Sequence, residues 1–158
     1  MSNIAIFPGS FDPLTKGHEN IVRRALPLFD KIIVAVGQNA GKKNLFSLEQ
    51  RVDFITKTFA DTPKISVETY DGLTVDFCKK HNANFLLRGL RNATDFEFER
   101  DIAFFNKDLS PNLETVFILT DPEFSHVSSS VVREVLRHGG DVTKFLPNTL
   151  KINSPEGA

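Results

Sequence analysis

Residues 7–18 read Phe7-Pro8-Gly9-Ser10-Phe11-Asp12-Pro13-Leu14-Thr15-Lys16-Gly17-His18. The stretch continues an apolar run that begins at Ile4, and it leads into residues 19–29, whose apolar side chains recur at helical spacing. α/β proteins present backbone N–H groups to a phosphate by one common arrangement. It consists of a strand, a loop rich in Gly and Pro, and a helix that begins beside a histidine. The pattern therefore predicts a nucleotide site at this turn.

The core of this loop, Thr15-x-Gly17-His18, is a short motif with two interpretations. It has neither Gly-x-Gly-x-x-Gly spacing nor a Gly-Lys-Ser/Thr ending, which argues against dehydrogenases and P-loop ATPases. By itself, a glycine turn before a helix explains the motif without any function. Its position favours function, because a histidine where a strand becomes a helix can donate a hydrogen bond to an anion held at the helix N-terminus.

Length and composition indicate a single domain that spans residues 1–158. The chain is 41% hydrophobic, which is enough for a core without disulfides or a structural metal. A net charge of −1 lacks the basic excess of nucleic-acid-binding proteins, so we expect no nucleic-acid partner. The single cysteine, Cys78, excludes a disulfide within the chain and is interpreted as a packed thiol.

The apolar runs also bear on location. The longest of them, such as residues 32–36, are too short to span a bilayer. No charged and then apolar leader precedes Gly9. We therefore expect a cytoplasmic protein with no membrane partner.

Short apolar runs bounded by turn residues predict five strands. They cover residues 4–7, 31–37, 65–70, 85–87 and 113–119. Helical patterns separate them, and strands that alternate with helical crossovers form parallel sheets. We expect an α/β fold, a single-domain, doubly wound, mostly parallel five-stranded sheet of the Rossmann-like nucleotidyltransferase type, with the site at its carboxyl edge.

The helices carry local start and stop signals. Pro27 should kink or end the first helix, since proline removes a backbone hydrogen bond. Ser47 with Gln50, and Thr94 with Glu97, are predicted capping boxes. The helix after Thr94 should carry apolar residues on one side and polar ones on the other, namely Phe96, Ile102, Phe105 and Leu109 opposite Glu99 and Asn106. Gly139-Gly140 should close the last helix, and the tail from about residue 148 is expected to be loosely held.

Cations follow two of the predicted strands. Lys42 and Lys43 lie in a polar loop after residues 31–37 and, taken singly, are best interpreted as solvated. Arg88 and Arg91 follow the strand at 85–87, where ligands bind in open α/β sheets. Because a guanidinium can hold two phosphate oxygens, we favour a functional role for these arginines.

The sequence Ser128-Ser129-Ser130 opens the last predicted helix. Capping explains one serine. Three hydroxyls and the unpaired N–H groups of a helix N-terminus would together make a second phosphate cradle. No Gly-x-Ser-x-Gly elbow, His-Glu-x-x-His helix or metal-ligand spacing around His81, His126 or His138 is present. Cations, hydroxyls and backbone donors without a general base suit nucleotidyl transfer from ATP to a phosphate, whose nucleophile is already an anion.

Together these motifs resemble the bacterial phosphopantetheine adenylyltransferases, a nucleotidyltransferase family whose His-containing loop is shared with class I aminoacyl-tRNA synthetases. The resemblance runs from Ile4 to about Pro147. It rests on residues 8–13 with Thr15-x-Gly17-His18, Lys42, Arg88-Gly89-Leu90-Arg91, Asp95-Phe96-Glu97 with Glu99, residues 114–117, Ser128-Ser129-Ser130 and Gly140-Asp141-Val142.

The resemblance implies transfer of the adenylyl group of ATP to 4′-phosphopantetheine, giving dephospho-coenzyme A and pyrophosphate, with Mg²⁺ accompanying ATP. It implies catalytic roles for His18, Lys42 and Arg88, with His18 stabilising the transition state at the α-phosphate. It implies substrate contacts from Ser10, Lys42, Thr74 and Arg88. It implies ATP contacts from Ser10, Phe11, His18, Gly89, Leu90, Arg91, Glu99, Phe124, Ser125, His126, Val127, Ser128, Ser129 and Ser130. It also implies a homohexamer.

Two positions depart from the family pattern. Ser10 stands where threonine is common and keeps the hydroxyl, whereas Thr74 replaces a larger apolar residue, so only a backbone contact to the pantetheine arm is expected there. Two alternatives stay open. One is a related nucleotidyltransferase with a cytidylyl or nicotinamide-nucleotide product, against which Lys42 and the Arg-Gly-Leu-Arg run argue. The other is a sensor that binds ATP or coenzyme A without turnover, against which His18 and the paired cations argue.

Overall fold

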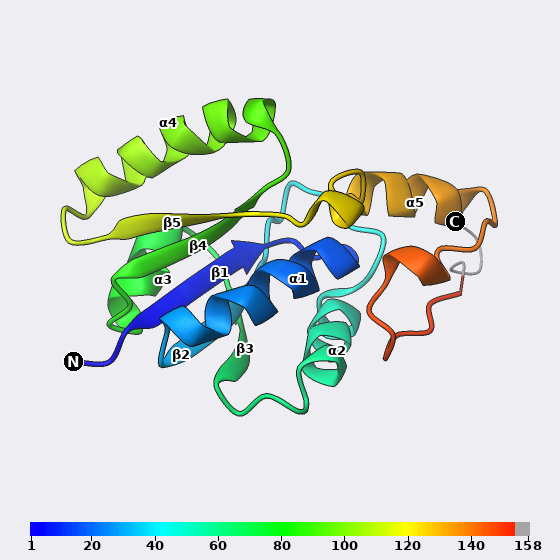
Figure 1. Cartoon of the computed structure of the whole chain (residues 1–158), viewed down its shortest axis with the longest axis horizontal. Helices are drawn as coiled ribbons and strands as arrows, with labels where there is room; N and C mark the ends of the chain where they lie inside the picture. The colour runs from blue at the N-terminus through cyan, green and yellow to red at the C-terminus, as the bar shows by residue number, and fades with distance from the viewer. Residues whose placement is uncertain (154–158) are drawn as a thin grey trace.

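The computed structural model describes residues 1–153, and residues 154–158 lie outside the described part. Its centre is a parallel five-stranded sheet with the order β3-β2-β1-β4-β5 (Figure 1). The strands are β1 (Ile4–Gly9), β2 (Lys31–Gly37), β3 (Ile65–Tyr70), β4 (Phe85–Leu90) and β5 (Glu114–Leu119). This confirms the predicted fold class. The strand order reverses between β1 and β4, and ligands of open α/β sheets bind at such a switch point.

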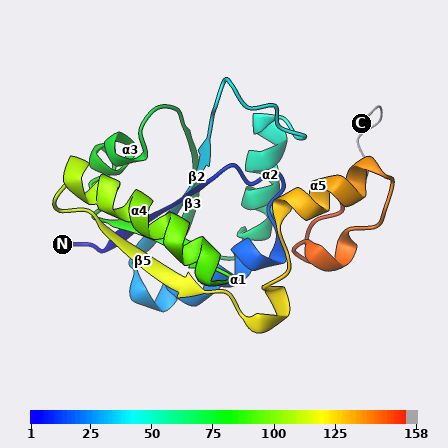
Figure 2. The same ribbon diagram turned by 90° about the horizontal axis from the view of Figure 1, so that it is seen from above.

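Helices cover both faces of the sheet. They are α1 (Lys16–Ala25), α2 (Leu48–Thr58), α3 (Thr74–Lys80), α4 (Ala93–Leu109) and α5 (Ser129–Arg137), with short 3₁₀ helices at Leu26–Leu28, Pro122–Phe124 and Thr143–Phe145. Figures 1 and 2 show α1 and α2 on one face and α3 and α4 on the other, while α5 lies beyond the carboxyl ends of the strands. Helix α1 ends at Ala25, and Pro27 follows in the 3₁₀ turn, as the sequence predicts.

Alternation along β1 divides the core between the two faces. Ala5 and Phe7 pack with the residues of α1 and α2, whereas Ile6 packs with Val75 and Cys78 of α3. Burial raises the pKa of the Cys78 thiol to about 11, in keeping with a packed rather than a reactive cysteine.

A third apolar cluster joins α5 to the segment that follows it. Its buried members are Phe46, Val132, Leu136, Val142, Leu146 and Leu150. Leu150 is 4% exposed, so the beginning of the tail that was expected to be loose packs against α5. The last five residues of that tail lie outside the described residues. Within residues 1–153, no helix is both long and apolar enough to cross a membrane.

Two sequence predictions about β4 and α4 are wrong. Strand β4 extends through Leu90, so Arg88 lies within the strand rather than after it. Helix α4 begins earlier than Thr94, because Asn92 serves as the N-cap and accepts a hydrogen bond from the Asp95 N–H at 2.9 Å. Asparagine caps as well as threonine, so the propensity of the cap alone could not decide between them.

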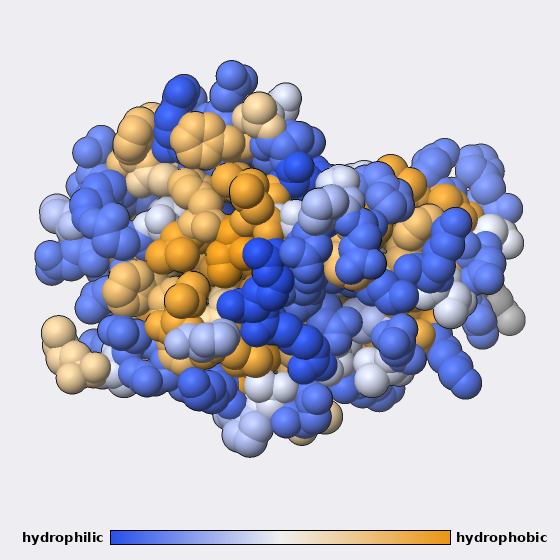
Figure 3. All heavy atoms as spheres, in the orientation of Figure 1, coloured by the Kyte–Doolittle hydropathy of each residue, from blue (hydrophilic) through white to orange (hydrophobic). Residues whose placement is uncertain are grey.

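Helix α4 also packs with its polar side inward. Within α4, all of which the structure describes, Glu99 is the one buried residue. Its large apolar side chains are exposed, namely Phe96, Phe98, Ile102, Phe104, Phe105 and Leu109. Figure 3 shows apolar side chains gathered over α4 and the adjoining β5. The apolar side that the sequence predicts therefore exists but does not face this chain's core.

Candidate functional site

Two neighbouring cavities open at the carboxyl ends of β1 and β4. The first, about 350 Å³, lies between the loop after β1, the start of α1 and the start of α5. The second, about 600 Å³, lies between the ends of β1 and β2, the start of α3 and the inner side of α4. Both are lined by the same set of residues where they meet: Pro8, Gly9, Ser10, Lys42, Arg88 and Glu99. The arrangement is that of two cavities with one shared wall.

His18 lines the first cavity and is held by the start of its own helix. Thr15 is the N-cap of α1, and its hydroxyl accepts a hydrogen bond from the His18 backbone N–H at 3.4 Å. The imidazole Nδ1 in turn accepts one from the Thr15 N–H at 3.1 Å. The motif is therefore a capping box in which histidine replaces the usual Glu or Gln. Since Nδ1 accepts, the neutral ring carries its proton on Nε2.

The charge state of His18 follows from its surroundings. Burial, and then the positive charges of Arg88 and Arg91, lower the pKa of His18 to about 4. The imidazole is consequently neutral at pH 7, so that it can offer a hydrogen-bond donor but no positive charge. The structure shows the glycine turn and its cap. Because the same cap also orients the ring that lines the first cavity, a functional role for His18 stays a prediction that this geometry permits.

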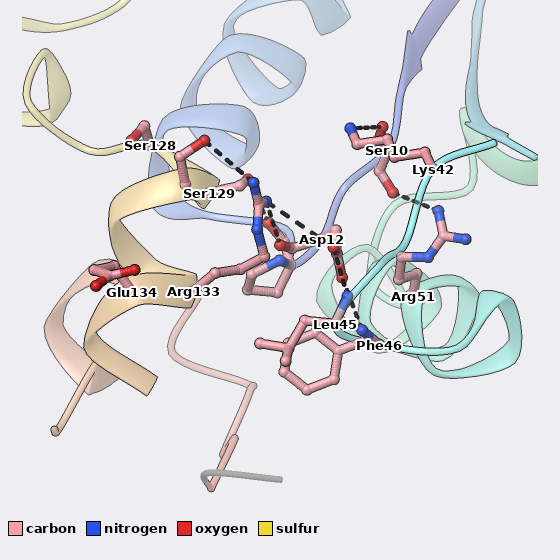
Figure 4. Close-up of polar contacts among 12 residues, drawn as sticks. Ser10, Asp12, Lys42, Leu45, Phe46, Arg51, Ser128, Ser129, Arg133 and Glu134 are labelled. Carbon is pink, nitrogen blue, oxygen red and sulfur yellow. Dashed lines mark hydrogen bonds and ion pairs between the residues drawn. The ribbon is translucent and has the colours of Figure 1, made fainter. Parts of the chain in front are cut away.

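Ser10 and Lys42 meet at the shared wall. The Lys42 ammonium donates to the Ser10 hydroxyl at 3.0 Å, although the two residues lie on different loops. Beneath them, buried Arg51 of α2 donates to the Ser10 carbonyl at 2.8 Å (Figure 4). It also donates to the Gly37 carbonyl at 3.4 Å. The ends of β1 and β2 are thereby joined under the site. Lys42, which taken singly looked solvated, has a partner that only the fold supplies.

Arg88 is held on two sides. Its Nε donates to Glu99 Oε2 at 2.8 Å and its Nη2 to Glu99 Oε1 at 2.6 Å. Its Nη1 donates to the Pro8 carbonyl at 2.7 Å. A guanidinium has five N–H donors, so two remain for a ligand in the described structure. Glu99 therefore sets the direction of Arg88, a role beyond the ATP contact that the family resemblance implies for it.

The start of α5 forms the opposite side of the first cavity. Ser128 is the N-cap, whose hydroxyl accepts from the Val131 N–H at 3.2 Å. Ser129 donates to the Pro13 carbonyl at 2.8 Å, which ties α5 to the loop after β1. Ser130 lies beside Arg133, its hydroxyl accepting from Nη2 at 3.2 Å. Helix N–H groups, hydroxyls and a guanidinium together present hydrogen-bond donors to the cavity.

Most of the predicted site residues line a cavity. Those lining the first are Ser10, Phe11, His18, Lys42, Arg88, Gly89, Arg91, Glu99, Val127, Ser128, Ser129 and Ser130. Thr74 lines the second, where its hydroxyl lies 3.1 Å from that of Tyr70. In the described part of the chain, four predicted residues line neither cavity: Leu90, Phe124, Ser125 and His126. Leu90 is buried at 6% exposure and Ser125 donates to the Pro122 carbonyl.

Several residues of the site were missed by the sequence reasoning. Arg133 lines the first cavity and follows Ser130 by three positions, a spacing that places both on one side of a helix and could have identified it. Asp12, also in the first cavity, stands inside the opening motif, but its partners are distant in sequence. Asn106 and Thr115 line the second cavity. The spacing of Asn106 from Glu99, which puts both on the polar side of α4, could have identified it, whereas no local signal marks Thr115 or buried Arg51.

Comparison with known proteins gives consistent results. Residues 6–135 match the model of the family described as cytidylyltransferase-like. The phosphopantetheine adenylyltransferase of Flavobacterium johnsoniae is 57% identical over 148 residues, covering 94% of this chain and 97% of that protein. The enzyme of the same name from Flavobacterium psychrophilum is 56% identical over 148 residues, with the same two coverages, 94% and 97%.

Among solved structures, the bifunctional NMN adenylyltransferase/ADP ribose pyrophosphatase from Francisella tularensis superposes with a TM-score of 0.72. The superposition covers 95% of this chain and 46% of the Francisella chain, at 19% sequence identity. At that identity the likeness shows the fold alone. The superposition supports the α/β fold described above.

Proposed function

This chain belongs to the phosphopantetheine adenylyltransferase family, within the cytidylyltransferase-like group, and we propose on that premise that it transfers the adenylyl group of ATP to 4′-phosphopantetheine. The products are dephospho-coenzyme A and pyrophosphate, and the reaction is a step of coenzyme A biosynthesis. The single observation that carries the proposal is the pair of cavities that share Ser10, Lys42 and Arg88. Two substrates bound there would meet at their reacting phosphates.

The reaction needs no general base, because its nucleophile is already charged. A phosphate oxygen of phosphopantetheine attacks the α-phosphorus of ATP and forms a new P–O bond. The bond from that phosphorus to the oxygen bridging to the β-phosphate breaks, and pyrophosphate leaves with the electron pair. The protein's contribution is then alignment and stabilisation of charge.

Each side of the first cavity has a place in this reaction. The triphosphate would lie against the start of α5, with Arg91 and Arg133 supplying charge-assisted hydrogen bonds. His18, neutral and protonated on Nε2, would donate to the α-phosphate as negative charge grows there. Lys42 and Arg88, on the shared wall, would hold the attacking phosphate and offset its repulsion by ATP.

We propose that Mg²⁺ enters with ATP. The carboxylates lining the first cavity already have partners: Asp12 with Leu45 and Phe46, Asp95 with Arg91, and Glu99 with Arg88. Within residues 1–153, no group of three or more His, Cys, Asp or Glu is placed to hold a metal ion. Mg²⁺ commonly keeps several waters and binds through substrate phosphates, so these residues fit an ion held by ATP itself, which would neutralise part of its charge.

The exposed apolar side of α4 supports a further part of the proposal, a homohexamer. Six large apolar side chains of this helix are exposed in the single chain: Phe96, Phe98, Ile102, Phe104, Phe105 and Leu109. Of these, Ile102 also lines the second cavity. Apolar patches of this kind, next to exposed Leu119, are typical of protein interfaces. A second copy of this chain would cover them. A cytoplasmic location, which suits an enzyme of coenzyme A biosynthesis, stays a prediction.

One assay tests the function directly. Purified protein with ATP, Mg²⁺ and phosphopantetheine should release pyrophosphate, and mass spectrometry should find dephospho-coenzyme A. Reactions with nicotinamide mononucleotide as acceptor, or with CTP as donor, serve as matched alternatives. Faster turnover in either would indicate a different nucleotidyltransferase, and tight ATP binding without turnover would indicate a sensor.

A further inference from the structure

Asp12 is a buried carboxylate that lines the first cavity and has no part in the reaction proposed above. Its side chain is 1% exposed, although it lies only three residues after Gly9, the end of β1, which lines both cavities. Oδ2 accepts a hydrogen bond from the Leu45 N–H at 2.8 Å, and Oδ1 accepts one from the Phe46 N–H at 2.9 Å (Figure 4). Both oxygens are therefore committed to one segment of backbone. An ionised carboxylate is buried at this depth only where such donors compensate it.

That segment is the end of the loop that carries Lys42. The loop runs from residue 38 to residue 46 between β2 and α2. At its start, the Gln38 N–H donates to the Tyr70 carbonyl at 2.7 Å, which fixes the loop to β3. Between these anchors, the backbone N–H groups of Gly41 and Lys42 donate to Asn39 of the same loop. Asp12 thus anchors the loop on the other side of Lys42, through Leu45, which follows Lys42 by three residues.

Asp12 also touches the opposite side of the site. Arg133 of α5 donates through Nη1 to the Asp12 carbonyl at 2.8 Å, and the same nitrogen lies 4.0 Å from Oδ2. Arg133 is itself a cation of the first cavity. The Asp12 carboxylate therefore lowers the positive potential on that side while it holds the Lys42 loop on the other.

We propose that Asp12 is a positioning residue for the acceptor substrate: its carboxylate fixes the Lys42 loop, and so places the Lys42 ammonium beside Ser10 where the phosphate of phosphopantetheine binds. The proposal rests on the function proposed above and on Lys42 as an acceptor contact. It predicts an asymmetric loss. Without the carboxylate, Lys42 is displaced and acceptor binding falls, whereas ATP binding does not weaken, because a negative charge next to Arg133 has been removed.

The principal variant is Asp12→Asn, which conserves size and keeps one acceptor oxygen. The KM for phosphopantetheine, at saturating ATP, should rise about tenfold or more, since small displacements of a binding group are costly. The dissociation constant for ATP, measured by calorimetry, should stay within about twofold of the parent or tighten, because the lost charge repels the triphosphate. Equal losses for both substrates would overturn the proposal, since they would show a merely structural role.

A double-mutant cycle tests the link to Lys42. Lys42→Met alone should raise the KM for phosphopantetheine, and Asp12→Asn combined with Lys42→Met should add no more than about twofold, because residues that act through one contact are not additive. Effects that multiply would overturn the proposal. If Lys42→Met leaves the KM for phosphopantetheine unchanged, both the assignment of Lys42 to the acceptor and the proposal for Asp12 are refuted. The proposed reaction itself would still stand, provided that the parent enzyme turns over ATP and phosphopantetheine.

Ser47→Ala is the matched control. Ser47 directly follows the anchored segment and caps α2, but it lines neither cavity among the described residues. Its loss should lower the melting temperature and leave the KM for phosphopantetheine within about twofold, since a cap contributes to stability only. A matching rise in KM would overturn the proposal by showing that any destabilisation here has that effect.

Asp12→Glu is the second variant, for the case in which Asp12→Asn does not fold. It keeps the charge and both acceptors but carries them one methylene further from the backbone. It should raise the KM for phosphopantetheine, with the folded fraction measured by ATP calorimetry. An unchanged KM in folded Asp12→Glu, despite the displaced carboxylate, would overturn the proposal.

Discussion

Glu99 of α4 holds Arg88 of β4 through two parallel contacts, Nε to Oε2 at 2.8 Å and Nη2 to Oε1 at 2.6 Å. The side chain of Glu99 is 10% exposed and that of Arg88 is 30% exposed. This pair attaches the polar side of α4 to the sheet and at the same time directs a cation into both cavities. One ion pair therefore serves packing and the site together.

Glu99→Gln should show how much the ion pair contributes to stability and how much to substrate binding. The amide keeps the shape but removes the charge and one acceptor, so Arg88 should turn away from the shared wall. We expect kcat/KM for phosphopantetheine to fall by about tenfold and stability to fall by about 1–3 kcal/mol, as for lost hydrogen bonds to charged groups. Steady-state kinetics and thermal melting measure the two effects. Glu97→Gln, exposed on the same helix, is the control, and identical behaviour of the two variants would contradict the role of Glu99.

His18→Ala should affect turnover far more than binding. If the imidazole donates to charge that develops in the transition state, kcat should fall by about two to three orders of magnitude with little change in ATP affinity. The variant also loses one half of the α1 capping box, which should cost about 1 kcal/mol of stability. Single-turnover rates and ATP calorimetry check the separation, with exposed His138→Ala as the control. A rate within a few-fold of the parent would leave His18 with its capping role alone.

The protonation of His18 gives a pH prediction. Its pKa is lowered from 6.5 to about 4 by burial and by Arg88 and Arg91. The imidazole should thus stay neutral from pH 8 down to about 5, and no loss of activity in that range should come from its protonation. Because the folded state binds fewer protons than the unfolded state between these two pKa values, stability should fall as pH drops from 6.5 to 4.

NMR of the imidazole carbons can measure this pKa. ATP should raise it, since the triphosphate offsets the two arginines. A value near 6.5 in the protein without ATP would contradict the neutral donor.

Lys42→Met and Arg88→Met should each weaken the enzyme toward phosphopantetheine. A charge-assisted contact to phosphate is worth about 1.5–3 kcal/mol, so kcat/KM should fall at least tenfold while ATP binding stays nearly intact. Lys43→Met is the matched control, because Lys43 is exposed and lines neither cavity in the described structure. Pantetheine without its phosphate should bind the variants and the parent about equally poorly. Loss of ATP binding instead would assign these cations to the triphosphate.

The apolar side of α4 predicts an assembly that one substitution can break. Phe98 and Phe105 are 68% and 71% exposed in the single chain, so a charge at either position should not disturb its fold. Phe98→Glu should reduce the mass measured by light scattering from that of a hexamer to that of a smaller species, because a charge in an apolar interface must be desolvated. A parent protein that is a monomer at working concentration would contradict this prediction.

Local signals predicted much of the fold. The strand at residues 31–37, the Ser47–Gln50 capping box and the glycine turn after α5 all lie where the sequence places them. Gly139 has a φ of +73°, a conformation that glycine adopts without strain. Each of these features depends on a few neighbouring residues and on backbone preferences. That is why they could be recognised from the amino-acid sequence alone.

The errors have two origins. The N-cap of α4 at Asn92 and the end of β4 at Leu90 were misplaced because several residues there suit either side of the boundary. The other error comes from a contact between distant segments. The inward side of α4 was hidden because a carboxylate normally faces water. Only Arg88, on a strand, makes its burial favourable.

By itself, the sequence determined the fold class and the turn between β1 and α1, because strand and helix periodicity and the Thr15-x-Gly17-His18 cap are short-range properties. The tertiary structure decided which residues meet. It brought Lys42 to Ser10 across 32 positions and Asp12 to Leu45 and Phe46, and it left the apolar side of α4 exposed. These outcomes depend on how parallel strands bring separate loops to one edge of a sheet. Which side chains are buried there, and which partners they find, depends on all of these loops together.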